Sequence, residues 1–126
     1  MKSLRSSIDI VLSPHRSEGF GLVLAEAMRA GKPVIATGWS GNLDFMDHKS
    51  AALIDAKEVP ASDRNNMYNT GVWAQPDLDH AASLIFRLAN DRVERERLGL
   101  AGQRKIEEFA DAARWKSLVE TRLRLI

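Results

Sequence analysis

The sequence predicts an α/β fold in which a parallel β-sheet is flanked by helices, and three consecutive segments near the amino terminus predict it. Residues 8–13 (IDIVLS) and 33–37 (PVIAT) are short, β-branched runs typical of buried strands, although Asp9 interrupts the first. Residues 22–30 (LVLAEAMRA), between them, are rich in helix formers and apolar on nearly every side, as in a helix packed on most faces. A strand, a helix and a second strand in this order form a βαβ unit, which favours parallel strands joined by a right-handed crossover.

The ends of these segments carry residues that terminate regular structure. Pro14 closes the first strand, and Gly31 supplies a stop for the helix just before the second strand. Residues 38–46 (GWSGNLDFM) then form a glycine-bearing loop, which we expect to open a short helix near Asn42, and residues 51–55 (AALID) form a third strand. The front half of the chain is therefore predicted to hold the sheet.

The second half of the chain is predicted to be mostly helical. It comprises, in order, a long polar loop (residues 56–71), a brief extended piece (72–76) and three helices (77–91, 92–110 and 111–126). The second of these helices is strongly charged, and we expect Gly99 and Gly102 to break or bend it. Trp73 and Trp115 are interpreted as packing anchors, because large aromatic side chains bury much apolar area.

Length and charge restrict the class of protein. The chain has 126 residues, of which 44% are hydrophobic, so residues 1–126 can form a single domain with its own core. A near balance of 18 basic and 17 acidic residues argues against a nucleic-acid partner, which would need a basic face.

The absence of some residue types excludes several kinds of site. Without cysteine there is no disulfide, no thiolate zinc site and no cysteine nucleophile. The histidines and carboxylates lack metal-ligand spacing, so no metal is assigned. The first apolar run is too short for a signal peptide or a membrane span, and a cytoplasmic location is expected.

Two loops that follow predicted strands, residues 14–21 and 38–42, are expected to carry the function. Open parallel sheets bind ligands beyond the carboxyl ends of their strands, so both loops should lie at the same edge. Gly19 and Gly21 let the backbone approach a ligand closely. The amides of residues 20–23 lie at a helix amino terminus, where N–H groups without helical partners attract an anion. A phosphate group is the ligand that this edge predicts.

Glu18 and Glu26 flank the glycine turn, with seven residues between them. Helix geometry places Glu26 on the same face as Leu22, while Glu18 precedes the helix, so the two carboxylates are expected to line one cleft at different depths. Ionised carboxylates repel phosphate but accept hydrogen bonds from hydroxyl groups. A nucleotide sugar, with polyols on both sides of a diphosphate, would suit the amides and the carboxylates together. The residues alone leave open that Glu26 is a paired structural residue and that the glycines only form a tight turn.

The stretch SEGFGLVLAEAMRAGKPVIATGWSGNLDFM (residues 17–46) closely resembles the donor-binding, carboxyl-terminal half of the retaining glycosyltransferases of family 4. These are group 1 glycosyltransferases with two Rossmann-like domains in the GT-B arrangement. The shared features are the spacing of the glutamates, the EGFG turn and the segment EAMxxGxPVIAT. The resemblance extends over residues 9–109. It implies a Rossmann-like GT-B half-domain with a helical carboxyl-terminal segment, which uses a nucleotide-diphosphate sugar and needs no metal or other cofactor.

The same resemblance implies a role for each matching residue. The donor site would consist of His15, Glu18, Gly19, Phe20, Gly21, Leu22, Glu26, Thr37, Gly41 and Asn42. Glu18 would be the catalytic residue facing the donor sugar, and Glu26 would bind the ribose hydroxyls. The backbone amides of residues 19–22 would hold the sugar and the diphosphate. From the residues alone, His15 is equally well interpreted as an exposed loop histidine. Where the family often has two adjacent glycines, this chain has Ser40 followed by Gly41.

The resemblance covers only part of a family member, because members are about three times as long and contain two packed domains. We expect the acceptor domain to be missing here, together with the arginine and lysine that hold the diphosphate. A fragment of this kind should have little transfer activity unless the amino-terminal domain or a partner protein completes it. The full-length protein is expected in the cytoplasm, or peripheral to the inner membrane. Two other functions remain open: a non-catalytic interaction module, which includes a homo-oligomer, and another GT-B enzyme such as an epimerase or a phosphorylase.

Overall fold

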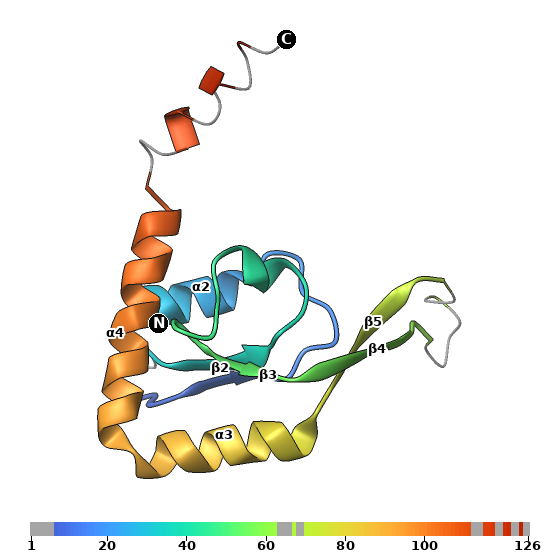
Figure 1. Cartoon of the computed structure of the whole chain (residues 1–126), viewed down its shortest axis with the longest axis horizontal. Coiled ribbons are helices and arrows are strands. Elements are labelled where there is room, and N and C mark those ends of the chain that lie inside the picture. The colour runs from blue at the N-terminus through green and yellow to red at the C-terminus, as the bar shows by residue number, and fades with distance from the viewer. Residues whose placement is uncertain are drawn as a thin grey trace.

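The expected βαβ unit begins the fold in the computed structural model of the chain (Figure 1). The structure describes residues 7–62, 67, 70–111, 115–117, 120–121 and 124. Strands β1 (Val11–Ser13), β2 (Val34–Thr37) and β3 (Ala52–Ile54) form a sheet in that order. All pairings in it are parallel, with Val11 opposite Val34 and Ala36 opposite Leu53. The predicted parallel sheet is therefore confirmed, and its carboxyl edge follows Ser13, Thr37 and Ile54.

Helices cover both faces of this sheet (Figure 1). Helix α2 (Leu22–Arg29) lies on one face and helix α3 (Leu78–Asn90) on the other, while α4 (Arg92–Phe109) packs mainly against α2. Because side chains alternate along a strand, β2 supplies both cores. Val34 and Ala36 join the cluster under α2, and Ile35 joins the cluster over α3. Every residue of β2 is buried, which explains why its first three residues are apolar, and Thr37 at its end is a buried polar residue.

Helix α4 is continuous, so the prediction that Gly99 and Gly102 break it is wrong. Both glycines face other segments of backbone instead. A Cβ atom at Gly99 would lie 2.2 Å from the carbonyl oxygen of Gly31, and one at Gly102 would lie 3.0 Å from that of Ser50. The missing side chains let α4 approach the turn after α2 and the segment before β3.

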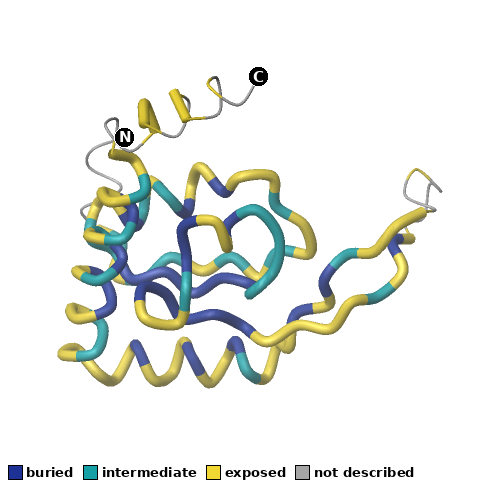
Figure 2. Tube along the Cα trace, turned by 45° about the horizontal axis from the view of Figure 1, so that its top comes forward, coloured by how far each residue is buried: buried dark blue, intermediate teal, exposed yellow. Residues whose placement is uncertain are grey.

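A two-stranded hairpin extends from the sheet where a polar loop was predicted. Residues 56–71 do not form one loop, because β4 (Ala56–Pro60) pairs with β5 (Val72–Pro76) in antiparallel fashion. Most residues of β4 are exposed, and Figure 2 shows the hairpin reaching away from the body of the domain. β4 was not predicted because an exposed strand lacks the apolar alternation by which a strand is recognised. The extended piece predicted at 72–76 corresponds to β5.

The carboxyl-terminal region is only partly described. Residues 115–117 and 120–121 are helical, and the rest of the predicted helix 111–126, except for positions 111 and 124, lies outside the described residues. The middle of the hairpin connection, at 63–66 and 68–69, is outside them too. Among the helices that the structure describes, none has the length and apolar character needed to cross a membrane.

Candidate functional site

Two loops meet at the carboxyl edge of the sheet, and we call residues 14–21 the first loop and residues 38–42 the second loop. The Gly41 N–H donates to the carbonyl oxygen of Glu18 at 3.3 Å, and the Ser40 hydroxyl donates to the same oxygen at 2.5 Å. A Cβ atom at Gly41 would lie 1.5 Å from the carbonyl oxygen of Gly19, so only glycine fits there. The prediction that both loops share one edge is confirmed.

Ser40 adopts a backbone conformation that normally belongs to glycine. Its φ of 80° and ψ of −159° lie in a region that side chains disfavour, at a cost of about 1–3 kcal/mol. It stands where one glycine of the family's usual pair was expected. Its hydroxyl also lies 3.4 Å from the Glu18 amide, which donates to it. The hydroxyl thus contacts both backbone polar groups of Glu18 and offsets part of the strain.

His15 bridges the two loops through both nitrogens of its ring. Nδ1 accepts from the Ser13 hydroxyl at 3.1 Å, and Nε2 lies 3.1 Å from both the carbonyl oxygen of Trp39 and Oδ1 of Asn42. These partners assign the proton to Nε2, because both groups facing that nitrogen are acceptors. The histidine therefore ties the end of β1 to the second loop, a role that was not among the two predicted from the sequence, which were ligand binding and an exposed loop position.

Asn42 and Thr37 are completely buried beneath the second loop. The Asn42 side-chain amide donates to the carbonyl oxygen of Thr37 at 3.1 Å, which closes the loop on itself. The Thr37 hydroxyl has no hydrogen-bond partner among the described residues. Both side chains therefore lie behind the surface of the loop, and the Asn42 amide supports its backbone.

The turn into α2 has the geometry expected of an anion site. Gly21 caps the helix with a φ of 87°, which is the left-handed region that glycine tolerates. The Ala25 N–H makes the first intrahelical bond, to Gly21 O at 2.9 Å, so the amides of residues 22–24 precede the helical ladder. Leu22 and Val23 are exposed, so this end of the helix is accessible to a ligand.

Phe20 anchors the same turn through its ring. The ring centroid lies 5.0 Å from that of Phe45 and 6.0 Å from that of Phe109, so the side chain packs toward η1 (Gly41–Asp44) and α4. The resemblance implied only a backbone role for this residue. The apolar side chain fixes the turn whose amides would contact a ligand, and sequence spacing gave no signal for that cluster.

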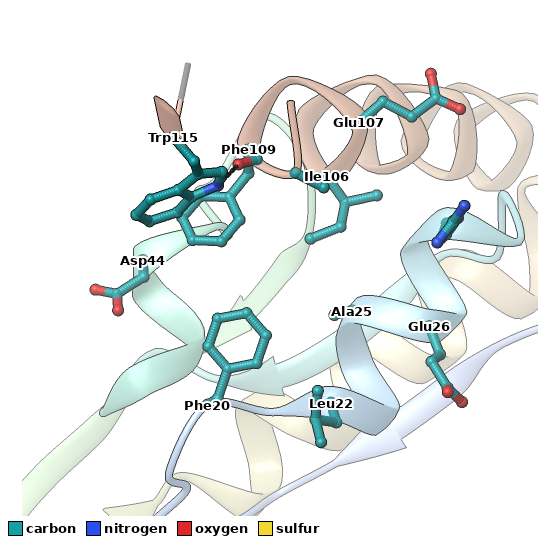
Figure 3. Close-up of a pocket in the computed structure, with 11 residues that line it drawn as sticks. Phe20, Leu22, Ala25, Glu26, Asp44, Ile106, Glu107, Phe109 and Trp115 are labelled. Carbon is teal, nitrogen blue, oxygen red and sulfur yellow. Dashed lines mark hydrogen bonds between the residues drawn. The ribbon is translucent and has the colours of Figure 1, made fainter. Parts of the chain in front are cut away.

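A groove of about 860 Å³ runs beside α2 (Figure 3). Its walls are largely apolar, and Glu26 and Glu107 are two of the charged residues that line it. In Figure 3 the Glu26 carboxylate is directed away from Phe20 and Trp115. Glu18 is not among the described residues that line this groove. The expectation of one cleft lined by both carboxylates is therefore not met here.

The shifted carboxyl pKa values belong to residues outside the two loops. Hydrogen bonding to Lys105 lowers the pKa of Asp47 to about 2. Hydrogen bonding to Arg97 lowers the pKa of Glu94 on α4. In the described ranges, no group of three or more His, Asp and Glu side chains is arranged to hold a metal ion.

A parallel sheet with helices on both faces and two interlocked loops at its carboxyl edge defines a Rossmann-like half-domain. The model of the glycosyl transferases group 1 family matches residues 1–105, and the chain belongs to this family.

Two similar proteins give the scale of the match. Over 49 residues, which are 39% of this chain and 13% of the relative, the chain is 39% identical to an uncharacterised glycosyltransferase from Methanocaldococcus jannaschii. The fold is similar to that of sucrose-phosphate synthase from Thermosynechococcus elongatus, with a TM-score of 0.65 and 21% identity, over 98% of this chain and 27% of that one. The fold is thus that of a GT-B half-domain, and the chain spans only a small part of either relative.

Proposed function

We propose that this chain binds the nucleotide-diphosphate sugar of a retaining, family 4 glycosyltransferase, a hexosyltransferase in type. Membership of the group 1 family supports an enzyme of this class. The single observation that carries the proposal is the turn at Gly21, which opens α2 with exposed residues and amides that precede the helical ladder. Such an end suits a diphosphate because its N–H groups and the helix dipole both favour negative charge.

Each polar group at this edge then has a part of the ligand to bind. The amides of residues 19–22 hold the diphosphate and the sugar, and the helix dipole offsets the charge of the leaving group without a metal. Glu26, one turn into α2, accepts hydrogen bonds from the ribose hydroxyls. Glu18, held at its backbone by Ser40 and Gly41, faces the sugar and supports the reaction centre.

Transfer to an acceptor requires more than this chain. The chain spans 13% of one relative and 27% of the other. An amino-terminal domain that binds the acceptor, or a partner protein in its place, would complete the site. We therefore expect donor binding without efficient transfer when the chain is assayed alone, because transfer requires an acceptor held in position beside the donor sugar.

Binding of nucleoside diphosphates tests the proposal. Calorimetry with UDP and GDP should give a measurable affinity for one of them, and Glu26→Gln should weaken it by about fivefold, because an amide replaces one carboxylate acceptor. Glu107→Gln is the matched control, since Glu107 lines the same groove from α4 and lies outside the motif. Equal losses in both variants, or no binding by the folded chain, would contradict the proposal.

A docking module is the second candidate, and the unpaired edge of β1 and exposed apolar side chains favour it. Leu12 on β1 and Leu22 and Val23 on α2 are exposed, and β1 pairs on one side only among the described strands. A second copy of the chain could pair with this strand edge. Light scattering that finds a monomer at high concentration would exclude the homo-oligomer. An epimerase or a phosphorylase of GT-B shape is less well supported, because the family match is to transferases.

A further inference from the structure

The hairpin of β4 and β5 contacts the first loop, although donor binding as proposed above makes no use of it. Arg16, which lies two residues before Glu18, makes several of these contacts. The Arg16 carbonyl oxygen accepts from the Ala74 N–H at 2.8 Å. Its guanidinium carbon lies 4.8 Å from the ring centroid of Trp73, and its Nη2 donates to Oε1 of Gln75. Three consecutive residues of β5 thus hold one residue of the loop.

This side of the hairpin is attached firmly to the body of the domain. The Asp77 N–H, just after β5, donates to the carbonyl oxygen of Asp55, just before β4, at 2.8 Å. The Asp55 N–H in turn donates to Nδ1 of His80 on α3 at 3.1 Å. Ala74, between the two partners of the Arg16 side chain, is fully buried. The base of the hairpin is therefore a fixed support for the loop.

The other side of the first loop is held by the second loop. Ser40 and Gly41 both donate to the carbonyl oxygen of Glu18. The short segment from Arg16 to Glu18 is therefore fixed from two directions, by β5 at one end and by the second loop at the other. Loss of either contact would leave the Glu18 backbone held from one side only.

We propose that the β4–β5 hairpin is a positioning element for the donor sugar and that Arg16 is the positioning residue through which it acts on Glu18. This inference rests on the proposed function. Glu26 and the Leu22 amide lie on α2, beyond Gly21, whereas the Gly19 amide follows Glu18 directly. Displacement of Glu18 therefore disturbs the sugar contacts more than the nucleotide contacts. The hairpin thus sets the affinity for the sugar part of the donor more than that for its nucleoside diphosphate.

A comparison of matched ligands tests this. Calorimetry on the full 126-residue chain would compare UDP with UDP-glucose and GDP with GDP-mannose. Arg16→Ala should lower the affinity for the preferred sugar conjugate by about tenfold and that for the diphosphate by less than about twofold, since it loses a cation–π contact and a hydrogen bond. Arg16→Lys keeps a cation over Trp73 and should lose less. Arg97→Ala, which removes an ion pair with Glu94 on α4, is the control and should change neither affinity.

Two results would overturn the inference. One is an equal loss of affinity for diphosphate and sugar conjugate in Arg16→Ala, which indicates general damage to the fold. The other is no loss for either ligand, which indicates that Arg16 does not act on the sugar site.

Hydrogen exchange separates this inference from the proposed function. In the chain without ligand, Arg16→Ala should speed exchange of the Ala74 and Gly41 amides by about threefold or more, because both donate to carbonyl oxygens of the released segment. The Ala25 amide within α2 should exchange as in the original chain. If no nucleotide binds, the proposed function fails, and the exchange result still decides whether the hairpin positions the loop. Unchanged exchange at Ala74 and Gly41 would overturn the positioning role.

Discussion

At the scale of single residues, Ser40 shows how a side chain replaces a glycine at a strained position. Its backbone lies in a glycine region, and its hydroxyl contacts both backbone polar groups of Glu18. Ser40→Ala keeps the strain and loses both contacts, so we expect it to lower the free energy of unfolding by about 1 kcal/mol. Ser40→Gly loses the same contacts but relieves the strain, so its stability should stay within about 0.5 kcal/mol of the original.

Urea unfolding of the three proteins measures this difference. Gly38→Ala is the control for adding a side chain to the same loop without backbone strain. Gly38 has no positive φ, and a Cβ atom there would meet its nearest neighbour at 3.4 Å, an ordinary contact. If the alanine and glycine variants at Ser40 are equally stable, the strain that the backbone angles imply is absent.

At the scale of elements, the contact between α4 and the turn after α2 depends on one missing side chain. In Gly99→Ala the new methyl group would lie 2.2 Å from a backbone oxygen that cannot rotate away, so α4 must shift. The gain in helix propensity is at most about 1 kcal/mol, and we expect a net loss of about 2 kcal/mol in unfolding free energy. Gly102→Ala, at 3.0 Å from Ser50, should lose less. Denaturant midpoints would show the ranking, and a more stable Gly99→Ala would contradict it.

The elements that were predicted correctly are those whose residues follow the period of their own structure. β2 is buried on both faces and apolar up to Thr37, and α3 begins after Asp77, whose carboxylate accepts from the His80 N–H. β4 has one intermediate and four exposed residues, so its sequence AKEVP carries no alternation, and only pairing with β5 makes it a strand. Gly99 and Gly102 were misjudged because the sequence does not distinguish a glycine that permits close packing from one that interrupts a helix.

At the scale of the whole molecule, the location of the candidate site was predictable, because sheet topology determines it. Parallel strands bring the first and second loops to one edge, and this followed from the order of the segments. The contacts that hold the first loop against β5 did not follow, because Arg16, Trp73 and Gln75 meet only through the hairpin, whose pairing was not predicted. For His15 the sequence left two interpretations, a ligand-binding residue or an exposed loop histidine. Its contacts with Trp39 and Asn42 came only from the three-dimensional structure.

The stability of the whole fold in acid should depend on Asp47, which joins the segment before β3 to α4. Its Oδ2 lies 2.8 Å from Nζ of Lys105, and its pKa falls from 3.8 to about 2. Because the folded pKa is the lower one, the stabilisation is complete above about pH 4 and is lost as the pH falls toward about 2. Both side chains are about 40% exposed, so solvent screening limits the contribution to about 1 kcal/mol. The difference in unfolding free energy between the original chain and Asp47→Asn should thus be about 1 kcal/mol at pH 6 and near zero at pH 2, and an equal difference at both would refute this origin.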